Sequence, residues 1–328
     1  MDSVDSRCQR RSTRELTEGR CGLAVAPVDG QAVKFGESRL LALTPGFPEP
    51  RTSKEKCLKE IIGTIAAVTG AGSGIGRATA LALAEAGARV AVTDLRPDRA
   101  RATADQIVQR GLQAEAFALD VADPDSVRRA ASEIEQCLGT PSLLVNNAGI
   151  GVGGLFLDTS LDSWRKILSI NLMGVVHCCR VFIPLMVAQD TPGHVVNIAS
   201  MLGYTGMKGV SAYCATKFGV MGLSECLRAE LHEHSIGVST VCPGMIRTDI
   251  INAGILESAT EDIEARRREI VSLYEKRNYP PGKVARAVVS AIRRNRAVVP
   301  VAPEAWAAYY SKRWIPGLVA WFARKHEL

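Results

Sequence analysis

The stretch from Ile65 to Gly76 reads I-A-A-V-T-G-A-G-S-G-I-G and gives the first indication of the fold. Its apolar run up to Thr69 predicts a short buried strand, and the Ala/Leu-rich residues 77–86 predict a helix. Alternating glycines lie between them: Gly70, Gly72, Gly74 and Gly76. Glycine suits a tight turn because a Cβ would block it or hold the backbone away from a ligand.

This glycine turn also predicts an anion site. Free amide groups at a helix N-terminus attract negative charge, so we expect a pyrophosphate group there. The spacing differs from the common fingerprint G-x-G-x-x-G, because the last position counted from Gly70 is Ile75. The candidate cofactor contacts in the turn are Gly70, Ser73, Gly74, Ile75 and Gly76.

From about Ile61 onward, apolar strands alternate with helical stretches. This alternation predicts an α/β fold, a single doubly wound Rossmann-like domain with a parallel sheet covered on both faces. Ligands in such sheets bind beyond the carboxyl ends of the strands. The predicted strands are Ile65–Thr69, Arg89–Thr93, Ala114–Ala118, Ser142–Val145, His194–Ile198, Val238–Cys242 and Ala297–Val301.

Length and composition set the outer bounds. The chain has 328 residues, of which 47% are apolar, so a substantial core can form. The net charge of +6 is modest, and no pattern suggests nucleic-acid binding. There are nine cysteines, without a C-x-x-C pair or the Cys/His spacing of a zinc site. We therefore expect no metal and a reducing, cytoplasmic setting. No run of about eighteen apolar residues is evident, so no membrane-spanning helix is expected.

Three segments are expected. Residues 1–58 are mixed polar and read as a flexible extension, as sequence upstream of the true start, or as a presequence, against which their acidic residues argue. Residues 59–302 form the predicted catalytic domain. Residues 303–328 form an aromatic and basic tail.

Polar residues follow the second, third and fourth predicted strands. Asp94 can accept hydrogen bonds from the ribose hydroxyls of an adenosine and would repel a 2′-phosphate. Arg96, two residues on, could instead accept such a phosphate, so NAD is favoured and NADP stays open. Asp120 and Val121 suit a polar and an apolar contact with an adenine edge. After the fourth strand come Asn146, Asn147, Ala148 and Gly149, whose small or amide side chains can approach a cofactor or tie strands together.

A possible proton-transfer set follows the fifth predicted strand. Ser200 is followed by Tyr213, and Lys217 comes four residues later, on the same face of a helix. A lysine ammonium beside a phenol would lower the phenol pKa and make Tyr213 a usable acid and base. Ser200 could hydrogen-bond a substrate oxygen.

Taken together, these features resemble the short-chain dehydrogenase/reductase family over about Ile61 to Val301. The matching pieces, in the family's order, are Thr69-Gly70-x-x-x-Gly74-Ile75-Gly76, Asp94, Asp120, Asn146 to Gly149, Asn171, Ser200, Tyr213 to Lys217, Pro243-Gly244 and Thr248. The resemblance implies a seven-stranded parallel sheet and reversible hydride transfer between NAD(P) and a carbonyl or secondary alcohol. It also implies a homodimer or homotetramer built on the helices beside Tyr213, although a membrane-bound monomer stays open.

The resemblance also implies individual roles. Tyr213 would be the general acid/base, and Lys217 would hold the nicotinamide ribose and depress the Tyr213 pKa. Ser200 would orient the substrate oxygen, and Asn171 would maintain a water-linked proton path to Lys217. The contacts implied on the nicotinamide side are Pro243, Gly244, Ile246 and Thr248.

Two segments suggest a lipophilic alcohol or ketone as substrate. Residues 248–282 look like the family's substrate loop, with an apolar face that could exclude water. Its residues are Ile263, Ile270, Val271, Leu273 and Tyr274, and Met201, Leu202, Met207, Met245 and Ile246 would line the same pocket. In the tail, Trp306, Tyr310 and Trp314 repeat at helical spacing among cationic residues. That stripe fits the protein's own core, peripheral membrane contact, a dimer contact or a lid.

Two alternatives to an enzyme follow from the same residues. The chain could bind NAD(H) as a sensor or scaffold without turnover, although the intact set Asn171, Ser200, Tyr213 and Lys217 argues against this. It could also act at a membrane as an adaptor through the aromatic tail.

Overall fold

The computed structural model describes residues 58–259 and 262–325, with the side chains of Phe322 and Lys325 left aside. All of these residues belong to one compact unit, Thr52–Leu328. The predicted N-terminal extension, residues 1–58, lies outside the described residues except for Leu58.

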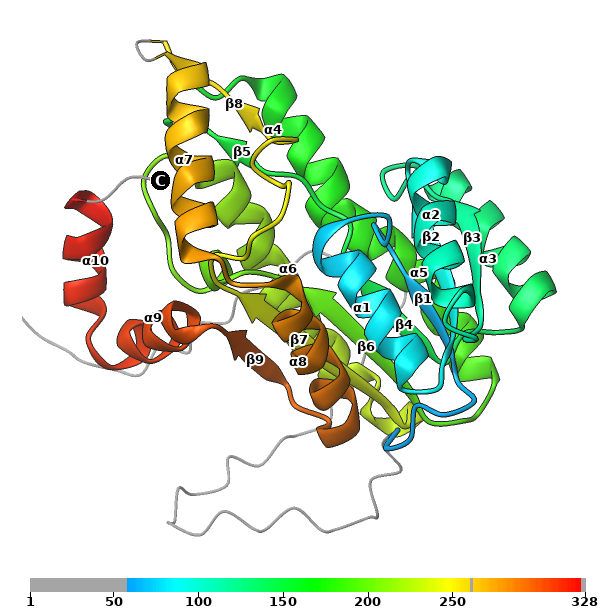
Figure 1. Cartoon of the computed structure of the whole chain (residues 1–328). Coiled ribbons are helices and arrows are strands. Elements are labelled where there is room, and N and C mark those ends of the chain that lie inside the picture. The colour runs from blue at the N-terminus through cyan, green and yellow to red at the C-terminus, as the bar shows by residue number, and fades with distance from the viewer. Residues whose placement is uncertain (1–57, 260–261, 326–328) are drawn as a thin grey trace, which may run out of the picture. The chain divides into compact units, whose positions relative to one another are not determined.

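A parallel sheet of seven strands forms the centre of this unit, in the order β3-β2-β1-β4-β6-β7-β9 (Figure 1). All neighbouring strands pair in parallel, so the predicted doubly wound fold is confirmed. The predicted strands are all present, with ends that differ by at most two residues. Their bounds are β1 Ile65–Val68, β2 Arg89–Asp94, β3 Ala114–Ala118, β4 Leu143–Asn146, β6 Gly193–Ile198, β7 Ile236–Pro243 and β9 Val298–Val301.

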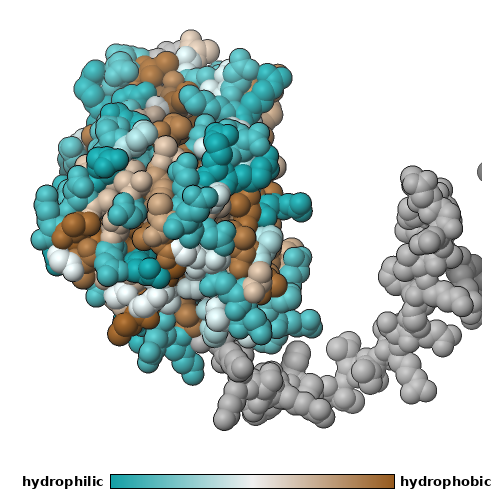
Figure 2. Space-filling view, turned by 90° about the vertical axis from the view of Figure 1, so that its right-hand side faces the viewer, coloured by the Kyte–Doolittle hydropathy of each residue, from teal (hydrophilic) through white to brown (hydrophobic). Residues whose placement is uncertain are grey.

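Helices cover both faces of the sheet. Successive side chains of a strand point to opposite faces, so Ala66 and Val68 of β1 join one apolar cluster and Ala67 joins the other. The first cluster lies under α1 (Gly74–Glu85), α2 (Pro97–Val108) and α8 (Pro281–Arg294). The second lies under α3 (Pro124–Leu138), α5 (Gly174–Ala188) and α6 (Ser211–Glu230). Figure 2 shows the side of the molecule near α2 and α3, where most of the surface is hydrophilic.

One helical run is longer than the sequence suggested. α4 (Leu161–Leu168), a π-helical turn (Ser169–Met173) and α5 form a continuous run of 28 residues, within which an 18-residue window has a mean hydropathy of 1.8. By length and composition this run could cross a membrane, which the sequence analysis did not expect. Its buried side chains Cys178, Phe182 and Met186 lie in the second apolar cluster, so packing against the sheet accounts for its apolar character.

The remaining elements gather near the carboxyl ends of the strands and at the end of the chain. Short strands β5 (Val152–Gly153) and β8 (Ile255–Leu256) pair in parallel beside α7 (Ile263–Arg277). Short 3-10 turns follow β6 (Met201–Gly203) and α6 (His232–His234). After β9 come α9 (Pro303–Trp314) and α10 (Pro316–Lys325).

Candidate active site

A cavity of about 510 Å³ opens at the carboxyl ends of the strands. It is lined by loops that follow β1, β2, β3, β4, β6 and β7, and by one face of α7. Of the catalytic and cofactor-contact residues predicted from the sequence, all line it except Gly76, Asn146 and Asn171. The cavity therefore lies where the sequence predicts it, beside the polar motifs that follow the strands.

The glycine turn after β1 is shaped by close backbone approach. A Cβ on Gly76 would clash with the carbonyl oxygen of Gly70, so only glycine fits there. Gly74 has a φ of 52°, and a Cβ on it would lie 3.3 Å from Thr248 Cγ2. Ser73 caps α1 without a side-chain hydrogen bond, and the first turn carries no acidic residue. The first amides of α1 are thus available to an anion in the cavity.

Asn147 ties the glycine turn to the end of β4. Its Nδ2 donates to the carbonyl oxygens of Thr69 at 2.9 Å and Gly70 at 3.1 Å. The Thr69 hydroxyl accepts hydrogen bonds from the backbone amides of Asn147 and Ala148, both at 3.0 Å. These hydrogen bonds fix the position of the glycine turn relative to the end of β4 at the floor of the cavity.

Asp94, at the end of β2, has both carboxylate oxygens engaged. Oδ2 accepts a hydrogen bond from the Gly72 amide at 2.9 Å, and Oδ1 accepts one from the Arg96 amide at 3.0 Å. Each oxygen keeps a second lone pair for a ligand hydroxyl. The guanidinium of Arg96 is held by Asp98 at 2.9 Å.

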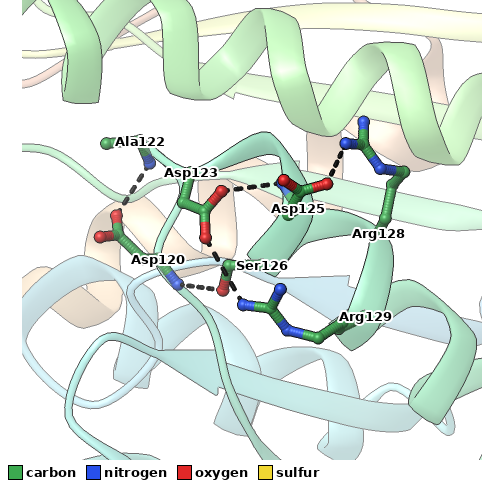
Figure 3. Close-up of polar contacts among 7 residues, drawn as sticks. All are labelled: Asp120, Ala122, Asp123, Asp125, Ser126, Arg128 and Arg129. Atoms are coloured by element: carbon green, nitrogen blue, oxygen red, sulfur yellow. Dashed lines mark hydrogen bonds and ion pairs between the residues drawn. The ribbon is translucent and has the colours of Figure 1, made fainter.

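Asp120 is held in a turn before α3, which Figure 3 shows in close-up. Its Oδ1 accepts a hydrogen bond from the Ala122 amide at 2.9 Å, and its own amide donates to Ser126 Oγ at 3.1 Å. Asp123 then caps α3 through the Asp125 amide. The other Asp120 oxygen makes no bond to the residues drawn, so it can accept from a ligand in the cavity.

Ser200, Tyr213 and Lys217 meet at one end of the cavity. Ser200 and Tyr213 both line this end, and the Ser200 hydroxyl lies close enough to the Tyr213 phenol to influence its pKa. Lys217 Nζ lies 5.6 Å from the centre of the Tyr213 ring and donates to the carbonyl oxygen of Ile198 at 2.9 Å. The structure thus brings together the three side chains that the sequence placed on a turn and a helix.

The electrostatics of this group differ from the expectation in one respect. Burial raises the pKa of Tyr213 above its ordinary value, with the nearby Tyr274 adding to the effect, although the neighbouring Ser200 hydroxyl opposes it. Burial also lowers the pKa of Lys217 to about 8. Desolvation therefore outweighs the lowering of the phenol pKa that Lys217 was expected to cause.

Asn171 lies in the π-helical turn between α4 and α5, a type of bulge that is frequent at functional sites. Its Oδ1 accepts from the Ile150 amide at 2.8 Å, and its Nδ2 donates to the Ile150 carbonyl at 3.0 Å. A Cβ on Gly149 would lie 3.2 Å from Asn171 Oδ1 and 3.8 Å from Lys217 Nζ. Gly149 therefore leaves space between Asn171 and Lys217.

The rest of the cavity wall is largely apolar. From α7, the residues Ile263, Ile270 and Tyr274 line it, as expected from their spacing. Leu273, expected on the same face, is instead 49% exposed. Of the apolar residues expected elsewhere, Met201, Leu202 and Ile246 line the cavity, whereas Met207 and Met245 are not among its lining residues.

Sequence reasoning missed a contact that joins the start of α9 to the cavity wall. Glu304 Oε1 accepts a hydrogen bond from the Met245 amide at 2.9 Å, and Oε2 pairs with Arg277 of α7 at 2.8 Å. Burial raises the pKa of this carboxyl, but hydrogen bonds from Arg277 and backbone amides outweigh it and leave the pKa low. The signal was available, because Glu304 follows β9 at the same edge of the sheet as the other site residues.

Comparison with known proteins identifies the family. Residues 64–257 match the family model of the short chain dehydrogenases. The probable oxidoreductase EphD of Mycobacterium tuberculosis is 43% identical over 256 residues, which are 77% of this chain. The chain spans only 43% of the length of that relative.

Two solved structures share the fold. A short chain dehydrogenase/reductase from Burkholderia phymatum in complex with NAD is 29% identical, with a TM-score of 0.74, over 79% of this chain and 96% of that one. A metagenomic short-chain oxidoreductase in complex with NADP is 31% identical, with a TM-score of 0.58, over 72% of this chain and 92% of that one. The chain therefore belongs to the short-chain dehydrogenase/reductase family, oxidoreductases that act on CH–OH and C=O groups with NAD(P).

Proposed function

We propose that this protein transfers hydride between a nicotinamide cofactor, preferably NAD(H), and the C=O or CH–OH group of a lipophilic substrate. The observation that carries the proposal is the meeting of Ser200, Tyr213 and Lys217 at one end of a cavity with largely apolar walls. When bound, the cofactor supplies or accepts the hydride, and the protein positions the reactants and manages one proton.

The geometry fits a dinucleotide along the strand ends. The first amides of α1, beside the cavity-lining residues Gly74 and Thr248, suit a pyrophosphate. Asp94 would accept from the adenosine ribose, and Asp120 and Val121 would contact the adenine edge. The cofactor would run along the cavity floor in contact with Asn147, Ala148 and Gly149. On the nicotinamide side the contacts would be Pro243, Gly244, Ile246 and Thr248.

The proton would move through Tyr213. Its raised pKa keeps the phenol protonated at neutral pH, so the hydroxyl can donate to a carbonyl oxygen as that oxygen gains charge. Ser200 would hydrogen-bond the same oxygen and stabilise the developing negative charge. Lys217, charged below its pKa of about 8, would then stabilise the phenolate that remains.

Asn171 would support the return of the proton. The space beside Gly149 separates Asn171 Oδ1 from Lys217 Nζ, and it is polar on both sides. A water molecule held there would connect Lys217 to the Ile150 carbonyl and to solvent. Asn171 would thus act by positioning a proton path without touching the substrate.

Cofactor titration followed by a substrate panel tests the proposal. Tight binding of NADH, weaker binding of NADPH, and turnover of an apolar ketone or alcohol are expected. Tyr213→Phe should keep the cofactor affinity and lower kcat at least about a hundredfold, because only the transferable proton is lost. Tyr310→Phe, on the exposed face of α9, is the matched control. Unchanged turnover in Tyr213→Phe would exclude its role, and cofactor binding without any turnover would favour a sensor or scaffold.

A further inference from the structure

The last two helices carry an exposed apolar surface that belongs neither to the cavity nor to the core. Trp314, which ends α9, is 80% exposed, and Leu318 and Trp321 of α10 are 56% and 51% exposed. Leu318 and Trp321 are three residues apart and therefore lie on neighbouring positions of one helix face. The tail surface, as we use the term, consists of Tyr310, Lys312, Arg313, Trp314, Ile315, Leu318, Trp321 and Arg324, all of them exposed.

The base of this surface is fixed to the protein. Ala305 is fully buried, and its carbonyl oxygen accepts a hydrogen bond from the Tyr204 hydroxyl at 2.6 Å. Trp306 stacks on Tyr310 with ring centres 5.8 Å apart. Figure 1 shows α10 standing beside α9 and away from the sheet, and α10 packs against α9. The tail surface is thus presented by α9, which is anchored to the protein, and by α10, which packs against α9.

The positive charge of the tail indicates what kind of partner the surface can bind. From Ala305 to Lys325 the sequence contains the cations Lys312, Arg313, Arg324 and Lys325 and no acidic residue. Two copies of this surface placed face to face would bring like charges together. An anionic partner is favoured instead, and it must also accept tryptophan and leucine side chains.

We propose that the tail surface docks on a bilayer that contains anionic phospholipid. Tryptophan and leucine side chains insert at the level of the headgroups, and lysine and arginine attract anionic lipid at the same depth. The sequence of these two adjacent short helices interleaves both kinds of side chain. This arrangement favours a helix pair that lies on a membrane over one that spans it.

Docking would place the cavity wall near the lipid. Glu304, in the first turn of α9, contacts the Met245 amide and Arg277 at the edge of the cavity. A lipophilic substrate could then enter from the bilayer side. This consequence rests on the proposed function, whereas the docking itself does not.

Cosedimentation of the full chain with vesicles tests the docking without any catalytic assay. We expect binding to equimolar phosphatidylcholine and phosphatidylglycerol, and much weaker binding to phosphatidylcholine alone. Lys312→Glu combined with Arg324→Glu should lower the partition into anionic vesicles at least about tenfold. The matched control is Arg293→Glu combined with Arg294→Glu at the exposed end of α8, which changes the net charge equally.

A separate variant tests how much the apolar side chains contribute to vesicle binding. Trp314→Ser should lower binding to anionic vesicles, whereas Val108→Ser, at an exposed position of α2, should leave it unchanged. Thermal unfolding shows whether each variant is folded. If the charge-reversed double variant is not folded, Lys312→Glu alone replaces it. Absent binding to anionic vesicles, or equal binding by the charge-reversed variant, would overturn the proposal. If light scattering gave Trp314→Ser a lower molar mass than the unchanged protein, the tail surface would instead be an interface between copies of the chain.

Discussion

At the scale of the residue, a carboxylate and a histidine show how position in the fold sets chemical character. Asp94 is bound to two backbone amides of its own neighbourhood and still faces the cavity. His194 is fully buried in β6, and its Nε2 contacts Ser239 Oγ at 2.8 Å. Because Ser239 donates to the Arg296 carbonyl, His194 must be the donor in that contact. Its Nδ1 is buried without a partner.

Replacing Asp94 should change the choice of cofactor. In Asp94→Asn the negative charge that would face a 2′-phosphate is lost, so we expect the preference for NADH over NADPH to fall about tenfold or more. Fluorescence titration of both cofactors gives the ratio. Asp105→Asn, which removes an exposed charge from α2, is the control. If Asp94→Asn rejects NADPH as strongly as the unchanged protein, this carboxylate does not discriminate.

Replacing His194 should change how stability depends on acid. Burial, and secondarily the charge of Arg228, lowers the His194 pKa to about 3, so the folded protein holds this ring neutral. The unfolded chain binds a proton near pH 6.5, and stability is therefore lost as the pH falls below that value. Between pH 7.5 and pH 5 the loss should be about 2 kcal/mol.

His194→Gln keeps a donor for Ser239 but cannot titrate, so this component of the pH dependence should disappear. Urea unfolding at the two pH values measures it, with the exposed His234→Gln as control. An unchanged pH dependence in His194→Gln would show that another group is responsible.

At the scale of the element, the sequence predicts most of what the structure contains. The strands are recognisable because each is a short and mostly apolar run, and most of them are followed by a polar motif. The core face of α7 is partly recognisable from Ile263, Ile270 and Tyr274. The pair β5 and β8 was not predictable, since each has two residues and Val152 pairs with Ile255 across about a hundred residues. Glu304 could be assigned to the same edge of the sheet because it follows β9, but its partners could not be predicted, since they depend on how β7 and β9 align.

The contact between α7 and α9 should matter more for substrate binding than for stability. Glu304→Gln removes the ion pair with Arg277, and because both side chains are partly exposed, the free energy of unfolding should fall by at most about 1 kcal/mol. A less firmly held α7 should raise KM for an apolar substrate severalfold without changing NADH affinity.

The control for this change is Glu264→Gln, which removes a carboxylate that pairs with Arg267 within α7 alone. The expected pattern is a changed KM in Glu304→Gln only. An equal rise in KM in both variants would show that charge, and not the connection between helices, is responsible.

At the scale of the whole molecule, the cavity draws on loops from six strands, so a bound cofactor should stabilise the entire unit. A ligand at a hundred times its Kd adds about 2.7 kcal/mol to the free energy of unfolding, which for a domain of this size raises Tm by roughly 5 °C. Scanning calorimetry with NADH, and with GTP at equal concentration as control, measures the shift. An equal response to the two nucleotides would contradict a site built for a nicotinamide dinucleotide.

The parallel pairing of the central sheet also has a kinetic consequence. Ala66 of β1 pairs with Leu143 of β4, and every other neighbouring pair of strands is likewise joined by a crossover segment. Such contacts have high contact order, and each requires a long loop to close before any pairing energy is gained. Refolding should accordingly be slow, and the ability to bind cofactor should return only when the last strands have paired. Cofactor binding at the strand ends thus reports that folding of the whole unit is complete.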